Sequence, residues 1–368
     1  MEKISTHQFM TLGSAVLMGI TFLPIASNVT RASGRDGWMT ILPGFAMGIP
    51  YGLMLLSLLA QYPHKNLLQI SETLFGKWTG KIIGSIYFLI SGYFGGLLLA
   101  QLGHVFHQSI MPLVPLWVFY LCGLLLVFCV VSSGIEVYAR FSELIFPIIV
   151  IALLLNVVFS IPRIEQGELL PILSEGLTPL FFGALKVMPF SMSYIFVLSG
   201  ILAFLPTGKQ ELAQLKTGVW RAVFLVGLLD TMVALIQILV FGPTETTRLV
   251  YGLLELGKMV DISRTVSGIE SLFMGVWLGS WIIKISAFFF AATWGLETVL
   301  KLKGVKGNLL VAALFWGITF GFKRGPSLIM EIGLVEAYVI LPFTSVWIVT
   351  LWGVSQWKGR RERVLKTN

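Results

Sequence analysis

The sequence predicts an all-α polytopic membrane protein with ten transmembrane helices in a single membrane domain. Of its 368 residues, 56% are hydrophobic and only 12% are charged, whereas a soluble chain carries about 25% charged residues. The mean hydropathy is +0.87. Apolar runs of about 20 residues, the length that crosses a bilayer, recur along almost the whole chain. This composition excludes a cytosolic enzyme, a disordered chain and a secreted disulfide scaffold.

Ten apolar segments are expected to span the membrane. The first is not a signal peptide, because its apolar run exceeds a signal core and no small-residue cleavage site follows it. The ninth is the shortest, and the third and eighth are long enough to tilt. The segments are 8–30, 38–60, 82–108, 114–132, 141–161, 180–204, 218–241, 270–298, 307–322 and 333–355.

The distribution of basic residues predicts the orientation of these spans. With the N-terminus in the cytoplasm, the cytoplasmic segments hold 16 of the 26 Lys and Arg residues and the outer segments hold 8. This bias places both termini in the cytoplasm, as an even number of spans requires. The basic tail 356–368 is expected to anchor the last span, with binding to anionic lipid as a second role. The net charge of +8 therefore reflects topology, and nucleic-acid binding is not expected.

The connecting loops are too short to hold a soluble domain. The longest, 242–269, contains the apolar stretch Leu249–Leu256, which we interpret as a surface helix on the outer side. Cys122 and Cys129 are interpreted as small core residues, and the histidines show no zinc-ligand spacing. The spans lack the signatures of intramembrane enzymes. We therefore expect no enzymatic activity, no cofactor and no metal.

Two spans carry helix-breaking residues near their middle. These are Gly19–Pro24 in span one and Lys186–Ser193 in span six. The two spans hold corresponding places in the halves 8–161 and 180–355. A break in each predicts an inverted five-plus-five transporter fold with helices 1 and 6 broken and a binding site at the midplane. Two ordinary proline kinks are the alternative, because prolines also lie in spans two, five and ten.

The residues around the two breaks predict a site for a small amphipathic solute. The N–H groups that begin a half-helix favour an anionic group such as an α-carboxylate. Short hydroxyls and aromatic rings flank both breaks, and one lysine lies inside span eight. The candidate ligand-binding residues are Gly19, Thr21, Phe22, Tyr93, Phe190, Ser191, Ser193 and Lys284.

Ionisable residues inside spans are costly and usually functional. Asp230, near the middle of span seven, and Lys284 are interpreted as polar members of a solute or proton pathway, or else as a buried structural pair. Glu336, near the outer end of span ten, is interpreted as structural. Arg140 and Glu143, three residues apart at the start of span five, are expected to pair on one helix face. That pair is either structural or a cytoplasmic gate.

Several local patterns together resemble one known family, the endospore germination permeases, which are the B-type integral membrane subunits of nutrient germinant receptors. The resemblance covers nearly the whole chain and is most specific in the loop after span two and in the run that precedes span five. The segments that carry it are Ile4–Phe9, Gly19–Pro24, Leu67–Lys81, Gly134–Pro147, Met188–Ser191 and Gly268–Phe273, with Trp277.

The resemblance implies a fold related to the amino acid–polyamine–organocation transporters and a location in the spore inner membrane. It implies binding of a germinant, usually an amino acid or another small nutrient, and action together with an A-type membrane subunit and a C-type lipoprotein. The resulting hypothesis is a germinant-sensing subunit that signals by conformational change. A proton- or sodium-coupled amino-acid permease is the main alternative, and a purely structural scaffold is a third.

Overall fold

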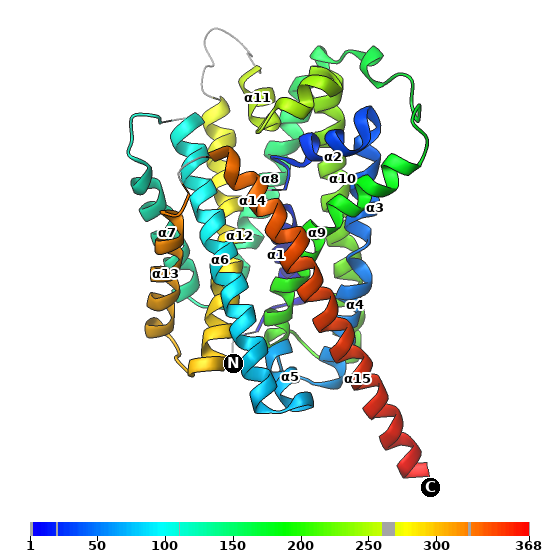
Figure 1. Ribbon diagram of the computed structural model, residues 1–368, viewed down its shortest axis with the longest axis vertical. Helices are drawn as coiled ribbons and strands as arrows, with labels where there is room; N and C mark the ends of the chain where they lie inside the picture. The colour runs from blue at the N-terminus through cyan, green and yellow to red at the C-terminus, as the bar shows by residue number, and fades with distance from the viewer. Residues whose placement is uncertain (1–2, 20, 110, 260–268, 323–324, 368) are drawn as a thin grey trace.

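The computed structural model describes residues 3–19, 21–109, 111–259, 269–322 and 325–367. Within these ranges the regular structure is helical, and the long helices run side by side as a bundle (Figure 1). The start of α1 and the end of α15 lie at the same end of the bundle as α5, whereas α11 lies at the opposite end. The helical fold class predicted from composition is therefore confirmed.

The first predicted span consists of two helices, α1 (Thr6–Met18) and α2 (Ile25–Ser33), separated by a non-helical turn. Ser5 caps α1 through a capping box with Gln8. Gly19 ends α1 with a φ of +32°, which residues with a side chain rarely adopt. The predicted break in span one is confirmed.

The second predicted span is divided into three helical pieces. A separate helix with a capping box follows it at the end of the bundle. The interruption of the second span at Met47 and Gly48 comes just before Pro50, in the first turn of the next helix, where a proline is tolerated. The pieces are η1 (Gly34–Thr40), α3 (Ile41–Ala46) and α4 (Ile49–Gln61), followed by α5 (Leu67–Phe75).

The third, fourth and fifth spans are continuous helices, α6 (Lys77–Ser109), α7 (Leu116–Ser132) and α8 (Ile135–Ser160). α6 and α8 begin five and six residues before the predicted spans, because their polar first turns continue the helix beyond the apolar run. Two short 3₁₀ turns, η2 (Ile161–Arg163) and η3 (Gln166–Leu169), follow α8.

The predicted break in span six is wrong. α9 (Thr178–Ile201) is helical throughout, with Pro189 inside it, and the 3₁₀ turn η4 (Leu202–Phe204) follows. Proline removes one N–H from the helix, and its ring disturbs the helical turn that precedes it. The hydroxyls of Ser191 and Ser193 donate to the carbonyls of Met188 and Phe190 at 2.8 Å each. These bonds to the backbone support a continuous helix around the proline.

The seventh span lies in α10 (Lys209–Arg248), which is kinked at Gly242, where φ is +74° and Pro243 follows. A helix is present near the predicted stretch Leu249–Leu256, α11 (Gly252–Met259), but its leucines are buried, and its place on the outer side stays a prediction. Next come α12 (Ile269–Leu300) and α13 (Val305–Thr319). The tenth span is interrupted: α14 (Gly325–Val335) leads into a π-helical segment, η5 (Glu336–Ile340), and then into α15 (Leu341–Thr367).

By length and composition, the described part of the chain has seven helical segments able to cross a membrane. α7 and α13 are apolar but shorter. The count of ten spans and the inverted repeat stay predictions. α12 packs against α6, α7, α8, α9 and α1, and α1 also packs against α10. The break between α1 and α2 therefore lies among the helices of the bundle rather than at its edge.

Candidate functional site

The break in the first span is held by two side chains from one face of α12. The N–H of Gly19 donates to Ala15 O at 2.8 Å, which closes α1. The Gly19 carbonyl accepts a hydrogen bond from the hydroxyl of Ser280. One turn along α12, the alkyl chain of Lys284 passes so close to Gly19 that a Cβ there would overlap it. The break and α12 therefore form one packed unit that depends on glycine.

Lys284 is a fully buried cation with a buried anionic partner. Both Lys284 and Glu336 are 1% exposed, and Lys284 Nζ lies 3.6 Å from Glu336 Oε1. Glu336 begins the π-helical segment η5 of the tenth span. A π-helical turn is rare and occurs frequently at functional sites. The pair therefore joins α12 to the irregular part of the last span.

Asp230 brings a second buried carboxylate to the same cluster. Asp230 is fully buried on α10, and its Oδ2 accepts a hydrogen bond of 2.9 Å from the hydroxyl of Thr21, inside the break. Its Oδ1 has no hydrogen-bond partner among the described residues. Asp230 interacts electrostatically with Lys284, but the ion pair of Lys284 in the described structure is with Glu336.

We call Asp230, Lys284 and Glu336 the buried charge cluster. It holds two carboxyl groups and one amino group from three spans, beside the break in a fourth. Buried charges need partners because removing them from water is expensive. With all three groups ionised, the cluster carries one excess negative charge. It is therefore suited to take up one further positive charge, either a proton or the cationic group of a ligand.

A small internal cavity adjoins the cluster. Its volume is about 20 Å³, room for about one water molecule. The N-terminus of α2, the positive end of that helix dipole, faces it through Pro24 and Asn28. The cavity is lined by Pro24, Asn28, Gln101, Phe190, Lys284, Ile329, Ile332, Gly333 and Glu336. In this conformation the site is closed around a space too small for an amino acid.

The structure brings most of the predicted binding residues to this region. Gly19, Thr21 and Lys284 meet directly, as described above, and Phe190 lines the cavity. Phe22 is buried beside the ring of Trp277, with ring centroids 5.8 Å apart. Ser193 lies beside the Glu336 carboxylate.

Two of the predicted residues lie elsewhere. Tyr93 is 37% exposed, and its hydroxyl donates to Glu331 Oε1 at 2.9 Å, so it does not reach the cavity. Ser191 packs against Gly48 at the start of α4, where a Cβ would lie 2.6 Å from its hydroxyl oxygen. Tyr93 was predicted from its depth in the membrane and Ser191 from its place beside the predicted break in span six, and neither observation tells which side of a helix faces the interior.

Sequence reasoning underestimated Glu336 and missed Ser280, Gln101 and Asn28. Glu336 was visible as an acidic residue inside a span, but the one local signal for the π-helical turn that directs it inward is Pro342, two residues after that turn, and a proline alone does not specify a π-helix. The other three are uncharged polar residues in apolar segments. Such residues are common in membrane helices, where they hydrogen-bond to neighbouring helices.

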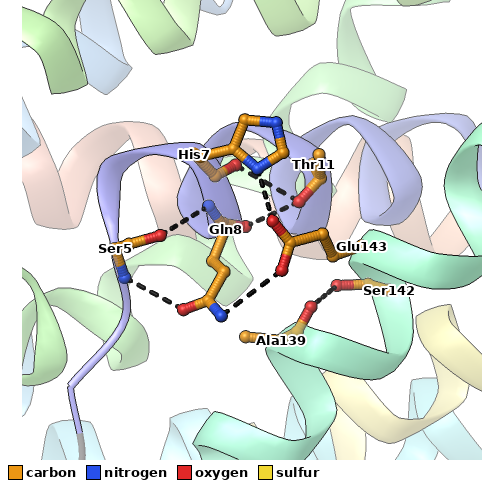
Figure 2. A network of polar contacts seen from close by, with 7 residues as sticks. All are labelled: Ser5, His7, Gln8, Thr11, Ala139, Ser142 and Glu143. Atoms are coloured by element: carbon orange, nitrogen blue, oxygen red, sulfur yellow. Dashed lines mark hydrogen bonds and ion pairs between the residues drawn. The ribbon is translucent and has the colours of Figure 1, made fainter.

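The predicted pair between Arg140 and Glu143 is wrong. Arg140 pairs with Glu136 at 2.6 Å, one turn earlier in α8, the i,i+4 arrangement with the acid on the N-terminal side that helices favour. Glu143 instead binds the start of α1. Its Oε1 lies 2.5 Å from His7 Nδ1, and its Oε2 accepts from Gln8 Nε2 at 3.4 Å (Figure 2).

This network fixes the N-terminal half of the broken span. Gln8 takes part both in the capping box with Ser5 and in the bond to Glu143 (Figure 2). The N–H of Ile4 donates to Phe204 O at 3.0 Å, and Thr6 donates to Gln214 at 3.1 Å. The start of α1 is therefore tied to α8, to η4 at the end of the sixth predicted span and to the first turns of α10. We call the contacts of Glu143 with His7 and Gln8 the inner latch, after the side of the membrane that the sequence predicts for this end of the bundle.

The other end of the broken span is tied down as well. The guanidinium of Arg31, at the end of α2, donates two hydrogen bonds of 2.9 and 2.5 Å to Thr247 O on α10. We call this contact the outer latch. Both halves of the broken span are thus held, one at each end of the bundle, while the buried charge cluster lies between them.

Comparison with known proteins agrees with this geometry. Two solved structures share the fold. Mhp1, a nucleobase-cation-symport-1 family transporter in a closed conformation with bromovinylhydantoin bound, matches 94% of this chain and 78% of its own, with a TM-score of 0.70 at 12% identity. The match to MhsT in complex with L-phenylalanine covers 95% of this chain and 89% of MhsT, with a TM-score of 0.69 at 11% identity. The fold is therefore that of membrane transporters.

The sequence relatives identify the family. Spore germination protein YndE of Bacillus subtilis (strain 168) is 22% identical to this chain, over 98% of the chain and 99% of that protein. The family model for spore germination proteins, the spore permeases, matches residues 3–323. The resemblance seen in the sequence is confirmed: the chain is an integral membrane protein with a transporter fold, and it belongs to the spore permease family of spore germination proteins.

Proposed function

We propose that this protein is the nutrient-sensing membrane subunit of a spore germinant receptor and that it binds a small zwitterion, an amino acid, at the buried charge cluster. One observation carries this proposal. Lys284 and Glu336 form a buried ion pair beside a helix break, with the partly unsatisfied Asp230 next to it. An amino acid carries one negative and one positive group. Its carboxylate can take the place of Glu336 beside Lys284, and its ammonium group can take the place of Lys284 beside Glu336.

The binding step is an exchange of ion pairs. The carboxylate of the ligand takes the place of Glu336 on Lys284, near the positive end of the α2 dipole. The ammonium group of the ligand takes the freed Glu336 or Asp230 Oδ1. Lys284 and the carboxylate that binds the ammonium group each keep a partner of opposite sign. The other carboxylate keeps the excess negative charge that the cluster already carried, so the exchange adds no further bare charge in the membrane. A conformation wider than the closed one must admit the ligand, because the cavity holds about 20 Å³.

Signalling follows if the ligand binds one conformation better than another. The two halves of the broken span, α1 and α2, are the elements expected to move, and the two latches hold them in the closed state. Moving a population from 1:99 to 99:1 requires about 5.5 kcal/mol of preference. Charge-assisted hydrogen bonds to both ends of a zwitterion supply an energy of this order.

The remaining parts of the proposal have two sources. The family resemblance supports a location in the spore inner membrane and an A-type membrane subunit and a C-type lipoprotein as partners. The distribution of basic residues supports both termini in the cytoplasm. The closed bundle would present a changed surface to the A-type subunit. A proton- or sodium-coupled amino-acid permease uses the same pocket, and the transporter fold supports this alternative. Uptake of labelled amino acid into proteoliposomes, present only for a permease, separates the two.

Binding to the purified protein tests the site. A panel of amino acids is titrated while heat flow is measured. The Lys284→Met variant should lose binding at least tenfold, because it removes the partner of the ligand carboxylate. Lys186→Met is the matched control, since Lys186 is also a lysine inside a span but lies exposed on α9. Equal losses in both variants, or no loss in Lys284→Met, would contradict the site.

A further inference from the structure

An apolar groove opens on the outside of the bundle, between the α5–α6 corner and α15. Its volume is about 450 Å³. One wall carries Phe75, Thr79 and Ile83, and the other carries Pro342, Val346 and Thr350. Trp347 forms part of its floor, and the indole donates to the Ser71 hydroxyl at 2.9 Å. The floor is thus rigidly attached to the body of the protein.

The groove faces lipid. Val346 is 67% exposed in the middle of the apolar segment Ser327–Lys358, where the surroundings of an exposed side chain are acyl chains. The hydroxyl of Thr79 bonds to the carbonyl of Phe75 at 3.3 Å, so it is satisfied within the chain. The groove therefore offers an apolar surface and suits an apolar occupant.

The length of the groove indicates which apolar occupant fits. Pro342 and Thr350 are eight residues apart on α15, about 12 Å at 1.5 Å per residue. The hydrocarbon core is about 30 Å thick, so one leaflet accounts for about 15 Å. The groove thus extends over one leaflet. An acyl chain matches this length, whereas a transmembrane helix of a partner protein would need a surface across both leaflets.

Positive charge lies at one end of the groove. Lys358 ends the apolar segment, and its Nζ donates to Leu74 O at 3.2 Å, next to Phe75 in the groove wall. The sequence that follows contains Arg360, Arg361, Arg363 and Lys366. Trp78, close by at the start of α6, is 82% exposed, as expected for an aromatic ring at the membrane–water interface.

We propose that this groove is a binding site for an anionic phospholipid. One acyl chain occupies the groove between α6 and α15, and the phosphate lies against Lys358. The apolar length and the cation at its end match the two parts of such a lipid. The proposal is independent of the solute site and of the proposed function.

Lipid retention by the purified full chain tests the proposal. The protein is exchanged into detergent with equal amounts of phosphatidylglycerol and phosphatidylcholine, and retained lipids are counted by native mass spectrometry. We expect phosphatidylglycerol to be preferred. Lys358→Gln should reduce this preference about fivefold, the effect of one basic residue at a membrane surface. Val346→Trp should reduce retention of both lipids, because the indole fills the groove.

Two matched variants serve as controls. Leu144→Trp enlarges a side chain that is also 67% exposed, on α8, and Lys306→Gln removes an exposed lysine at the start of α13. Both should retain lipid like the unchanged protein. Unchanged retention in Lys358→Gln and Val346→Trp overturns the proposal. Equal losses in the controls also overturn it, because the lipid would then be general annular lipid.

Discussion

A side chain at Gly19 would meet two obstacles, and both are local. The φ of +32° is rarely adopted by residues with a Cβ, and the space beside the Cα is filled by the Lys284 alkyl chain. A larger residue at position 19 would therefore have to displace Lys284 from its place next to Glu336. The residue therefore links backbone geometry directly to the buried charge cluster.

The Gly19→Leu variant is expected to abolish the germination response while the protein still accumulates in the membrane. The displaced Lys284 can no longer present its ammonium group to a ligand. Response to nutrient and membrane level are measured together in spores. The control is Gly317→Leu, since Gly317 on α13 has open space where a Cβ would lie. A normal nutrient sensitivity in Gly19→Leu spores would contradict the mechanism.

Removing one charge from the cluster and removing two should have different consequences. Lys284→Met alone leaves two buried carboxyl groups without a counter-charge, and losing one partner of a buried pair costs about 3–5 kcal/mol. The double variant Lys284→Met with Glu336→Gln removes the pair together. We expect its thermal stability to recover most of that loss, while amino-acid binding stays absent.

This comparison separates a structural role from a functional one. A purely structural pair predicts that stability and binding recover together in the double variant. Asp230→Asn should be mild in stability, because an amide oxygen still accepts from Thr21, but it should weaken ligand binding. Thermal unfolding and titration of ligand on the same three variants decide the question.

At the scale of single residues, the sequence showed which charges lie inside spans but not which of them are buried or which of them meet. Asp230 and Lys284 were found from their places inside apolar spans. The partner of Lys284 is Glu336, whose direction depends on a π-helical turn, and Tyr93 faces outward although it lies mid-span. Which side of a transmembrane helix faces inward is set by packing against other helices, and a hydrophobic run that is apolar on all sides carries little trace of it.

At the scale of elements, the two predicted breaks had different outcomes for a physical reason. Gly19 and Pro24 interrupt span one twice within six residues, and one of them adopts a positive φ. In span six Pro189 stands alone as a breaker, and serine hydroxyls on the same helix bond to nearby carbonyls. A single proline with such neighbours is compatible with a continuous helix. The interruption in span ten was not predicted, because its only nearby proline, Pro342, follows η5 and was interpreted as an ordinary kink.

The inner latch gives a prediction for the element α1. Glu143→Gln removes the charge that faces His7 and should loosen the start of α1. The side chains of His7 and Glu143 are 63% and 36% exposed, so the effect should be at most about 1 kcal/mol. Hydrogen exchange of the amides in 4–12 should rise less than tenfold.

The matched control is Glu297→Gln. Glu297 is also 36% exposed and pairs with Lys303 at 2.7 Å, but it makes no contact with α1 in the interactions described. In the Glu297→Gln variant, hydrogen exchange of the amides in 4–12 should stay unchanged. Equal exchange in both variants would show that the inner latch contributes nothing to the position of α1.

At the scale of the whole molecule, the buried charge cluster lies between two latches on the same broken span. The inner latch joins α1 to α8, and the outer latch joins α2 to α10. In the closed state both are formed and the cavity holds about 20 Å³. A rocking transporter fold opens one side at a time, so loosening one latch should expose the cluster from that side only.

The outer latch can be tested without any ligand, which avoids direct shielding of the site by a bound molecule. In a background where Cys122 and Cys129 are replaced by Ala, a cysteine is introduced by Asn28→Cys at the cavity wall. Its reaction with a water-soluble thiol reagent reports how often the cavity opens. Arg31→Ala removes two hydrogen bonds to Thr247 O, and because Arg31 is exposed we expect the two together to contribute about 1 kcal/mol. The open state should therefore be about fivefold more populated and the reaction about fivefold faster.

Arg248→Ala is the matched control, because Arg248 pairs with Glu245 within its own helix at 3.4 Å and does not join α2 to α10. It should leave the reaction of the Asn28→Cys cysteine unchanged. The open state is the minor one in this prediction, so Arg31→Ala changes the closed fraction only slightly, and the affinity of a ligand that prefers the closed state should stay nearly unchanged. An unchanged reaction rate in Arg31→Ala, or an equal rise in Arg248→Ala, would contradict a role of the outer latch in closing the bundle.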